Sequence, residues 1–347
     1  MRFFCAIVVL ALSAVFLGAE TPPPPTQEKF AAELAGIVAG LEKKSAAAVP
    51  GIDGWLFFGG ELRLLSLGHF WGADASKVSR AHKADLADPL PAIVDFHQQL
   101  KARGIELLLV PVPPKAAIYP EKIVAGFDLA ANDPSVHLRE FYKELGAAGI
   151  DVLDLTALFI QNRDNTRGPV FCKTDSHWSG VGCALAAQAI AEKVRSKIGA
   201  SGAPGDFTAE WKEVQITGDL DGLLPKEAAR PGPEKIALQN VSKKGGAAIE
   251  PDANSPLLLL GDSHTLVYHD FLSERAGLVD QLALQLGFAP DLIGTRGSGA
   301  TPVRINLYRR GAKDPGYLAK KKVIVWCFAA REFTEATEGW AKVPLAK

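Results

Sequence analysis

A surplus of charge of either sign is missing from this sequence. Its 347 residues include 38 lysines and arginines and 39 aspartates and glutamates, a formal net charge of -1 at pH 7. The basic clusters, such as residues 320–322, are short and typical of solvated helix ends. The composition therefore gives no support to binding of nucleic acid or of an anionic membrane surface.

Cysteine is also scarce, and the spacing of the four cysteines matches no zinc-binding pattern. Cys172 and Cys327 lie in apolar runs, which favours buried core thiols. In an oxidising compartment one disulfide among Cys172, Cys183 and Cys327 is permitted, and its pairing stays open. Neither a GxGxxG nor a P-loop sequence is present, so we predict no nucleotide and no other cofactor.

Four residues are of chemical types that can bind a metal ion: Asp175, His177, His264 and His269. His264 and His269 are five residues apart, which would place them on different faces of a helix. A zinc-binding helix pairs histidines that are four residues apart. We therefore predict no metal site.

The N-terminus has the layout of a secretory signal peptide over residues 1–19. Two residues, Met1 and Arg2, precede an apolar run, and small residues before Glu20 suit cleavage. An uncleaved anchor is the alternative, although the run is short for a membrane span. Residues 20–49 combine a polyproline tether with an amphipathic helix at 27–45. We therefore predict a periplasmic or secreted protein, with membrane association through the N-terminus as the alternative.

Strands and helices alternate from about residue 50 to residue 335, followed by a tail at 336–347. Helices are expected at 76–103 (interrupted near Pro89 and Pro91), 134–147, 180–198, 266–286 and 302–320, and strands at 105–110, 150–155, 256–260, 291–294 and 323–328. This alternation predicts a three-layer α/β/α domain with a mostly parallel central sheet. Residues 200–255, rich in glycine, proline and charge, are expected to be an insertion with short strands. In such a fold, ligands bind beyond the carboxyl ends of the strands.

The apolar run at 256–260 leads directly into Gly261, Asp262 and Ser263. Such a run is typical of a strand buried on both faces of a parallel sheet, and glycine permits a sharp turn after it. Ser263 would then lie at the carboxyl end of a central strand, beside free backbone N–H groups. This position suits a nucleophile next to an oxyanion hole. The alternative is that Asp262 or Ser263 only caps a helix.

Far upstream, Asp175 and His177 follow an extended run and would lie at the same end of the sheet. A serine hydroxyl needs a base to take its proton, and an imidazole fixed by a carboxylate can do so near neutral pH. The two residues would share one face of an extended segment, and a curled loop would let the carboxylate reach Nδ1. Alternatively, Asp175 caps the helix at 180–198 and His177 is an ordinary histidine. With Ser263 they predict a catalytic triad.

The block 261–263 resembles the nucleophile motif of the SGNH (GDSL-type) hydrolase superfamily. The block 173–178 is similar to the Asp/His motif of its alginate O-acetyltransferase branch, the AlgJ/AlgX-like family. Ordinary SGNH enzymes place the Asp/His block after the serine, with two residues between Asp and His. Here it precedes the serine with one residue between, as in that branch. Residues 53–57, 112–120 and 296–299 also resemble the branch, so the similarity covers about residues 50–335.

This resemblance implies that Ser263 is the nucleophile, His177 the base and Asp175 its partner. The Ser263 backbone N–H and the turn ending at Gly299 are candidate oxyanion donors. Other side chains after strand ends are candidates for substrate contact: Arg296 (with an ion pair as the alternative), Lys115, Tyr119, Arg331 and Trp178 (which would stack on a sugar, or belong to the core). The chain ends soon after the last expected strand, which favours the AlgJ-like arrangement over that of AlgX with its C-terminal carbohydrate-binding module.

The expected activity is transfer of acetyl groups through an acetyl-serine to hydroxyls of an exported polysaccharide, outside the cytoplasm. The resemblance also implies that a membrane-bound O-acyltransferase supplies the acetyl donor. One alternative is a carbohydrate acetyl esterase that uses the same triad with water as acceptor. The other is a non-catalytic polysaccharide-binding or scaffold protein of an export complex. The polysaccharide itself stays unassigned, because a fold-level resemblance does not carry a substrate.

Overall fold

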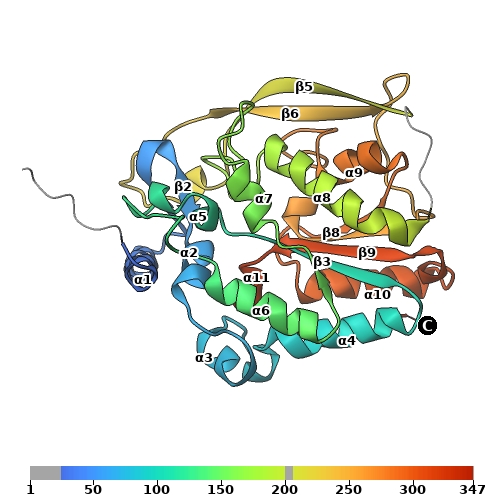
Figure 1. Ribbon diagram of the computed structural model, residues 1–347, viewed down its shortest axis with the longest axis horizontal. Coiled ribbons are helices and arrows are strands. Elements are labelled where there is room, and N and C mark those ends of the chain that lie inside the picture. The colour runs from blue at the N-terminus through green and yellow to red at the C-terminus, as the bar shows by residue number, and fades with distance from the viewer. Residues whose placement is uncertain (1–24, 200–205, 347) are drawn as a thin grey trace, which may run out of the picture.

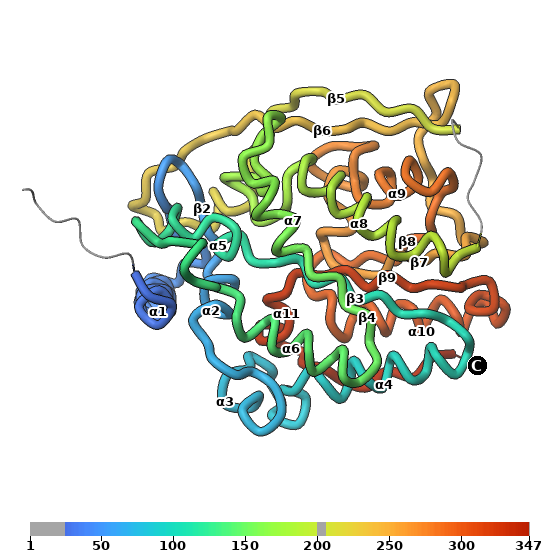
Figure 2. Tube along the Cα trace, in the orientation of Figure 1, coloured from blue at the N-terminus to red at the C-terminus, as the bar shows by residue number. Residues whose placement is uncertain are grey.

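A parallel five-stranded sheet forms the centre of the protein, in a computed structural model that describes residues 25–199 and 206–346 (Figure 1; Figure 2). Its strand order is β4-β3-β9-β7-β8, and every neighbouring pair runs parallel. The strands are β3 (Glu106–Val112), β4 (Asp151–Val152), β7 (Leu257–Gly261), β8 (Asp291–Gly294) and β9 (Val323–Ala329). Because all five run the same way, the loops that follow them meet at one edge of the sheet.

Helices cover both faces of this sheet (Figure 1). One face carries α7 (Thr156–Gln161), α8 (Gly180–Ile198) and α9 (Leu278–Leu286). The other carries α4 (Pro89–Lys101), α6 (Val136–Ala147) and α10 (Thr301–Lys313). The predicted three-layer α/β architecture is confirmed.

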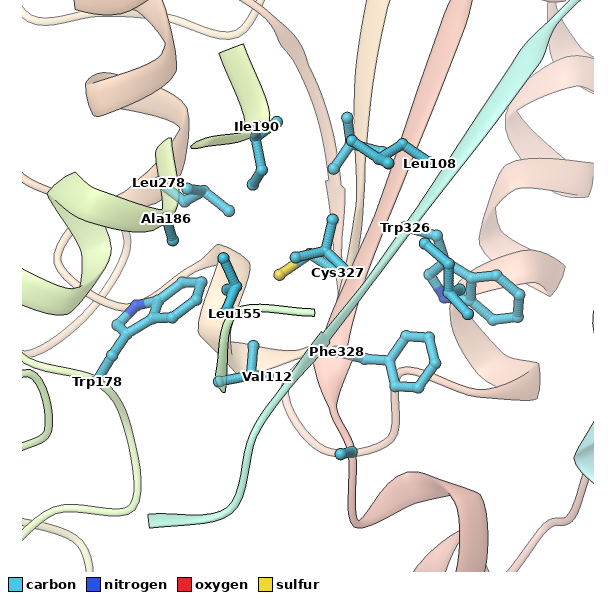
Figure 3. Close-up of a cluster of buried hydrophobic side chains, with 14 of the residues drawn as sticks. Leu108, Val112, Leu155, Trp178, Ala186, Ile190, Leu278, Trp326, Cys327 and Phe328 are labelled. Atoms are coloured by element: carbon cyan, nitrogen blue, oxygen red, sulfur yellow. The ribbon is translucent and has the colours of Figure 1, made fainter. Parts of the chain in front are cut away.

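The central strands are apolar along their whole length because neither face meets water. Every residue of β7 and of β9 is buried. Successive side chains of β9 fill opposite layers, since Cys327 points to one side of the strand and Trp326 and Phe328 to the other (Figure 3). Cys172, Cys183 and Cys327 are free and buried, so the disulfide that the sequence permits is not formed. Burial raises the pKa of all three thiols.

Gly261 ends β7 at a point where the backbone of β9 leaves no room for a side chain. A Cβ at this position would lie under 3.0 Å from the carbonyl oxygen of Cys327 and from the Thr265 methyl group.

We expect Gly261→Ala to lower the free energy of unfolding by about 2–3 kcal/mol, because overpacking displaces the backbone. Urea denaturation measures this, with Gly36→Ala in the exposed face of α1 as the control. A Cβ at Gly36 has no neighbour within 4 Å, and the change should stabilise by up to about 1 kcal/mol. Equal effects of the two substitutions would contradict the packing argument.

The predicted helix at 266–286 is wrong over its first half. A 3-10 turn covers Ser263–Thr265, an irregular loop follows, and α9 begins only at Leu278. Three non-glycine residues of this loop have positive φ: Tyr268, Leu272 and Arg275. A helix cannot include such residues, and tertiary contacts maintain them. One such contact is the Tyr268 hydroxyl, which donates to the carbonyl oxygen of Trp178 at 2.9 Å.

Other boundaries also differ from the sequence expectation. The helix expected at 76–103 is two helices, α3 (Ala75–Val78) and α4, joined by an irregular segment with a 3-10 turn. Pro89 and Pro91 begin α4 rather than interrupt a helix, because Asp88 caps it and proline suits a first turn. The helix expected at 302–320 ends at Lys313, and a 3-10 turn follows. The expected tail packs against the domain through buried Trp340 and Leu345.

An N-terminal unit packs beside the sheet domain (Figure 1). It consists of α1 (Gln27–Lys43), the antiparallel pair β1 (Ala48–Pro50) and β2 (Leu56–Phe58), and α2 (Gly59–Ser66). The predicted signal peptide at 1–19 and most of the polyproline tether lie outside the described residues. Within the described ranges, no helix combines the length and apolar character needed to cross a bilayer.

The segment expected to be a surface insertion forms a long antiparallel hairpin instead of short strands. Its strands are β5 (Phe207–Ile216) and β6 (Glu234–Lys243), ten residues each. In Figure 1 the hairpin lies across the outside of α8 and α9. Strand β6 packs inward through Ile236, Leu238 and Val241, which are buried. The hairpin thereby adds a further layer over one face of the domain.

Candidate active site

Ser263 lies directly after β7, at the carboxyl end of a central strand. The Asp262 carboxylate accepts the His264 backbone N–H at 2.9 Å and fixes the 3-10 turn that carries the serine. The backbone N–H of Ser263 donates to no acceptor in the part of the chain that the structure describes. This N–H is therefore free to stabilise an oxyanion at the edge of the sheet.

His177 and Asp175 meet Ser263 in one continuous chain of hydrogen bonds. The Ser263 hydroxyl lies 2.8 Å from His177 Nε2, and His177 Nδ1 lies 2.7 Å from Asp175 Oδ1. Asp175 Oδ1 also accepts the His177 backbone N–H at 2.9 Å, so the loop is curled as the triad hypothesis requires. Since a carboxylate only accepts, His177 donates from Nδ1 and offers the Nε2 lone pair to the serine.

The electrostatics of this chain favour an ionised carboxylate beside a basic imidazole. Burial alone would raise the pKa of Asp175, but the hydrogen bonds and charge of His177 and the Asp219 backbone N–H lower it to about 2. Burial would likewise lower the pKa of His177, but the hydrogen bond and charge of Asp175, with the charge of Asp219, raise it above 6.5. His177 therefore takes up its proton at a higher pH than an ordinary histidine does.

We expect activity to fall as the pH drops through the raised pKa of His177. Only neutral imidazole can take the serine proton, so kcat/KM should decline about tenfold per pH unit on the acid side. The midpoint should lie above 6.5, the ordinary value for histidine. The kcat/KM profile of acetyl ester cleavage measures this midpoint. Full activity between about pH 5 and pH 6, where the imidazole is charged, would contradict the assignment of the base.

A second histidine lies against the first and behaves differently. The rings of His264 and His177 have centroids 4.7 Å apart, and His264 Nδ1 lies 3.3 Å from the buried Asp262 carboxylate. Burial lowers the pKa of His264 to about 4 despite the nearby carboxylate. His264 is therefore neutral when His177 titrates, and Ser263 contacts His177 rather than His264.

The ligand atoms of Asp175, His177 and Asp219 lie within 4.8 Å of one another, which is close enough to hold a cation. These atoms already bond within the site, since His177 joins Asp175 to Ser263 and Asp219 accepts from Ser176. The sequence argument against a metal site assumed that His264 and His269 lie on one helix, and this assumption is wrong. His264 lies in the 3-10 turn and His269 in the irregular loop that follows.

Gly299 packs directly against the residue before the nucleophile. A Cβ at Gly299 would lie 3.0 Å from Asp262 Cβ and closer still to Phe328 Cβ. The Trp326 indole donates to the Gly299 carbonyl oxygen at 2.8 Å and fixes the orientation of the turn. The Gly299 N–H donates to no acceptor among the described residues. This geometry supports the prediction that Gly299 and Ser263 supply the oxyanion donors.

Phe271 lies against His177, and Arg296 lies over Phe271. The Phe271 ring meets His177 edge-on, with centroids 5.6 Å apart, and the Arg296 guanidinium lies 4.7 Å above Phe271. Arg296 also pairs with Asp270 at 2.8 Å, which is the alternative that the sequence left open. Sequence reasoning missed Phe271, because the expected helix gave no reason to place it beside His177.

Three of the candidate substrate contacts are structural instead. Lys115 is fully buried, and its Nζ donates to carbonyl oxygens including that of Asp175 at 2.6 Å. The buried Tyr119 hydroxyl accepts from the Val170 N–H at 3.0 Å. Trp178 has no exposed surface and lies within the buried cluster of Figure 3, so it cannot stack on a sugar. The prediction of substrate contact is wrong for all three, because none of them reaches solvent.

Arg331 lies close to the triad and is mostly buried. Its Nη1 is 3.3 Å from Oε1 of the buried Glu61. Burial opposes ionisation of Asp262, but His264 and the charge of Arg331 lower the pKa of this carboxyl, and the same charge partly opposes the rise of the His177 pKa. The sequence gave no indication of Glu61, which lies in α2 of the N-terminal unit. Arg331 thus places a positive charge beside the site without contacting the reacting atoms.

Comparisons with known proteins show which family this chain resembles. The family described as SGNH hydrolase-like domain, acetyltransferase AlgX, matches residues 48–287, a range that includes the triad. A probable alginate O-acetylase AlgJ of Pseudomonas putida is 28% identical over 257 residues, covering 71% of this chain and 63% of its own length. That of Pseudomonas aeruginosa is 28% identical over 307 residues, covering 84% and 71%. The chain thus spans less than two thirds of the first of these relatives.

Two solved structures share the fold. The O-acetyltransferase domain of Pseudomonas putida AlgJ superposes with a TM-score of 0.62 at 24% identity, covering 83% of this chain and 92% of that domain. Pseudomonas aeruginosa AlgX superposes with a TM-score of 0.58 at 18% identity, covering 81% of this chain and 61% of AlgX. At these identities the likeness concerns the fold.

Proposed function

Because the chain belongs to the family of SGNH hydrolase-like domains of the AlgX acetyltransferase type, we propose that it is a serine-dependent O-acetyltransferase acting on a polysaccharide. The observation that carries the proposal is the unbroken chain from Asp175 through His177 to Ser263. The relatives named as probable alginate O-acetylases support both the reaction and the acceptor class. Intact triad geometry disfavours a purely structural role.

The first half of the proposed reaction acetylates the enzyme. The Ser263 hydroxyl oxygen attacks the carbonyl carbon of an acetyl donor while His177 Nε2 takes its proton. The N–H groups of Ser263 and Gly299 hold the oxyanion that develops. The tetrahedral intermediate collapses, His177 returns the proton to the leaving group, and acetyl-Ser263 remains. Asp175 stabilises the imidazolium formed in between.

The second half transfers the acetyl group to a sugar. A sugar hydroxyl approaches acetyl-Ser263, His177 takes its proton, and the oxygen attacks the ester carbonyl. Collapse of the second tetrahedral intermediate releases the acetylated sugar and restores the serine hydroxyl with the proton from His177. Water reacting in the same way would give acetate, so the ratio of the two outcomes depends on access to the acyl-enzyme.

The proposal also covers location and donor. The signal-peptide layout of residues 1–19 supports a periplasmic or secreted protein, or one tethered by its N-terminus. The family resemblance supports an acetyl donor presented by a membrane-bound O-acyltransferase. Arg296 and Arg331 flank the site and support an acidic sugar as the acceptor, although each already has a carboxylate partner.

An acetyl ester with a chromogenic leaving group tests this proposal on protein lacking residues 1–19. Ester cleavage is followed with and without uronate and neutral oligosaccharides, and acetylated sugar is detected by mass spectrometry. Acetyl on the sugar that depends on Ser263 is the expected result. If acetate is the sole product with every acceptor, the protein is an esterase instead. If the wild-type protein cleaves none of the esters, the proposed chemistry is contradicted.

A further inference from the structure

The loop that carries the acid and the base of the triad has little secondary structure of its own. Residues 172–177 are irregular, closed by an isolated bridge between Phe171 and Trp178. Many of its polar backbone groups are instead bonded by a distant part of the chain, the connection between β5 and β6 together with the first residue of β6. We call Gly218, Asp219, Leu220 and Glu234, which make these contacts, the clamp.

Glu234, the first residue of β6, holds the start of the loop. Its carboxylate accepts the Lys173 N–H at 2.9 Å, the Thr174 N–H at 2.7 Å and the Thr174 hydroxyl at 2.6 Å. Three donors on one carboxylate fix the direction of the chain as it enters Asp175.

Asp219 holds the middle of the loop on both sides of the catalytic acid. Its carboxylate accepts the Ser176 N–H at 2.7 Å and the Ser176 hydroxyl at 2.6 Å. Its own backbone N–H donates to Asp175 Oδ2 at 2.9 Å. Because Asp175 Oδ1 is bonded to His177, the two oxygens of the acid are divided between the base and the clamp.

Backbone contacts complete the clamp. The Leu220 N–H donates to the Thr174 carbonyl oxygen at 3.2 Å. A Cβ on Gly218 would lie under 3.0 Å from that carbonyl group and from the Asp175 nitrogen. The two chains therefore touch peptide against peptide, and only glycine fits here. Lys115 Nζ donates to two further carbonyl oxygens of the loop, those of Lys173 and Asp175.

From these contacts we propose that the β5–β6 connection is the positioning element of the triad, with Asp219 and Glu234 as positioning residues that hold Asp175 and His177 in reach of Ser263. This inference rests on the proposed triad chemistry. It assigns a catalytic purpose to a segment that sequence patterns describe only as an insertion. Neither carboxylate contacts the reacting atoms, so both act through the loop.

A substitution of a positioning residue and one of a purely structural residue should have different effects on the kinetic constants. A misplaced loop lowers kcat, since loss of alignment by about 1 Å can cost ~100-fold, while substrate binding away from the loop is untouched. Charge gives a second signature. The titratable and charged groups that act on His177 are Asp175, Asp219, Arg331 and the neutral His264, and the Asp219 charge is one of those that raise its pKa.

The experiment compares Asp219→Ala, Asp219→Asn and Glu234→Gln in protein lacking residues 1–19, using the chromogenic acetyl ester. The matched control is Glu213→Gln, which removes an exposed ion pair to Lys235 in the same hairpin. We expect Asp219→Ala to lower kcat about tenfold or more with little change in KM. In Asp219→Asn, which keeps one acceptor for Ser176 but loses the charge, the acid limb of the pH profile should shift to lower pH. Glu234→Gln should lower kcat less than Asp219→Ala, because an amide retains one acceptor oxygen.

Folding is checked by thermal unfolding and circular dichroism. If Asp219→Ala does not fold, the isosteric Asp219→Asn decides the question. Wild-type kcat and an unshifted pH profile in folded Asp219→Asn, with Glu234→Gln also like wild type, would overturn the inference. The proposed function would stand in that case as long as Ser263→Ala is inactive. Activity that survives Ser263→Ala would instead overturn the triad and leave the clamp without a catalytic purpose.

Discussion

Replacing Ser263 by alanine is expected to reduce acetyl ester cleavage and acetyl transfer by about 10³-fold or more. Removing the serine of a serine–histidine–aspartate triad lowers kcat by a factor of ~10⁶ when background hydrolysis is subtracted. Here the hydroxyl lies 2.8 Å from His177 Nε2, and among the described residues no other side-chain hydroxyl hydrogen-bonds to that nitrogen. No neighbouring hydroxyl is placed to replace it.

The loss should be one of chemistry and not of folding. His177 is the partner of the Ser263 hydroxyl within the described ranges, so alanine should leave the free energy of unfolding within about 1 kcal/mol. Initial rates at saturating ester, with urea denaturation of the same preparation, measure both quantities. Ser196→Ala, at an exposed position of α8, is the matched control and should behave as wild type. A folded Ser263→Ala protein with more than about a tenth of wild-type activity is incompatible with a serine nucleophile.

Replacing Asp175 by asparagine is expected to have the second largest effect, a fall of about 10⁴ in kcat. That magnitude is the known effect of the equivalent change in a serine protease triad, where the imidazole takes the wrong tautomer. The same reasoning applies because Asp175 Oδ1 accepts from His177 Nδ1 at 2.7 Å. An amide that turns its NH₂ toward Nδ1 would leave the proton on Nε2, where the serine proton must go.

The ionised state of Asp175 adds a second expected result to this prediction. Its pKa is lowered to about 2, so the carboxylate is ionised throughout the working range and the amide removes a full charge. The raised pKa of His177 should therefore fall, and the acid limb of the residual activity should move to lower pH. Asp164→Asn, at an exposed position before the same loop, is the control. Residual kcat within about tenfold of wild type would show that Asp175 does not orient the base.

Sequence patterns placed Ser263 at the end of a central strand because the signals for that position are local. A fully apolar run, a glycine and a serine follow one another, and β7 ends at Gly261 as expected. Helix α8 was predicted with its observed bounds for the same reason, since Ser179 caps its start and Gly199 adopts the left-handed conformation at its end. The curled loop of Asp175 and His177 could also be predicted, because the two residues are only two positions apart in the sequence.

Contacts between distant segments could not be read from local patterns. A lysine such as Lys115 is expected at the surface, yet three carbonyl oxygens from two segments of the chain, Leu56 and the loop 172–177, surround its ammonium group. Asp219 lies 44 residues beyond Asp175 in a segment rich in turn formers, where an aspartate predicts only a loop. The loop at 266–277 has helical periodicity, but buried contacts such as that of the Tyr268 hydroxyl maintain a different path. In each case tertiary structure overrides a local preference.

The acetyl-serine intermediate is the step on which the proposed chemistry depends, and rapid-quench mass spectrometry measures it directly. Protein lacking residues 1–19 is mixed with an acetyl ester, quenched in acid at successive times and digested. We predict one acetyl group on the peptide that contains Ser263, which disappears when oligosaccharide is added while the sugar gains acetyl, and which Ser263→Ala never forms. Turnover with Ser263 unmodified at every time point, or acetyl attached to a different side chain, would contradict the proposed mechanism.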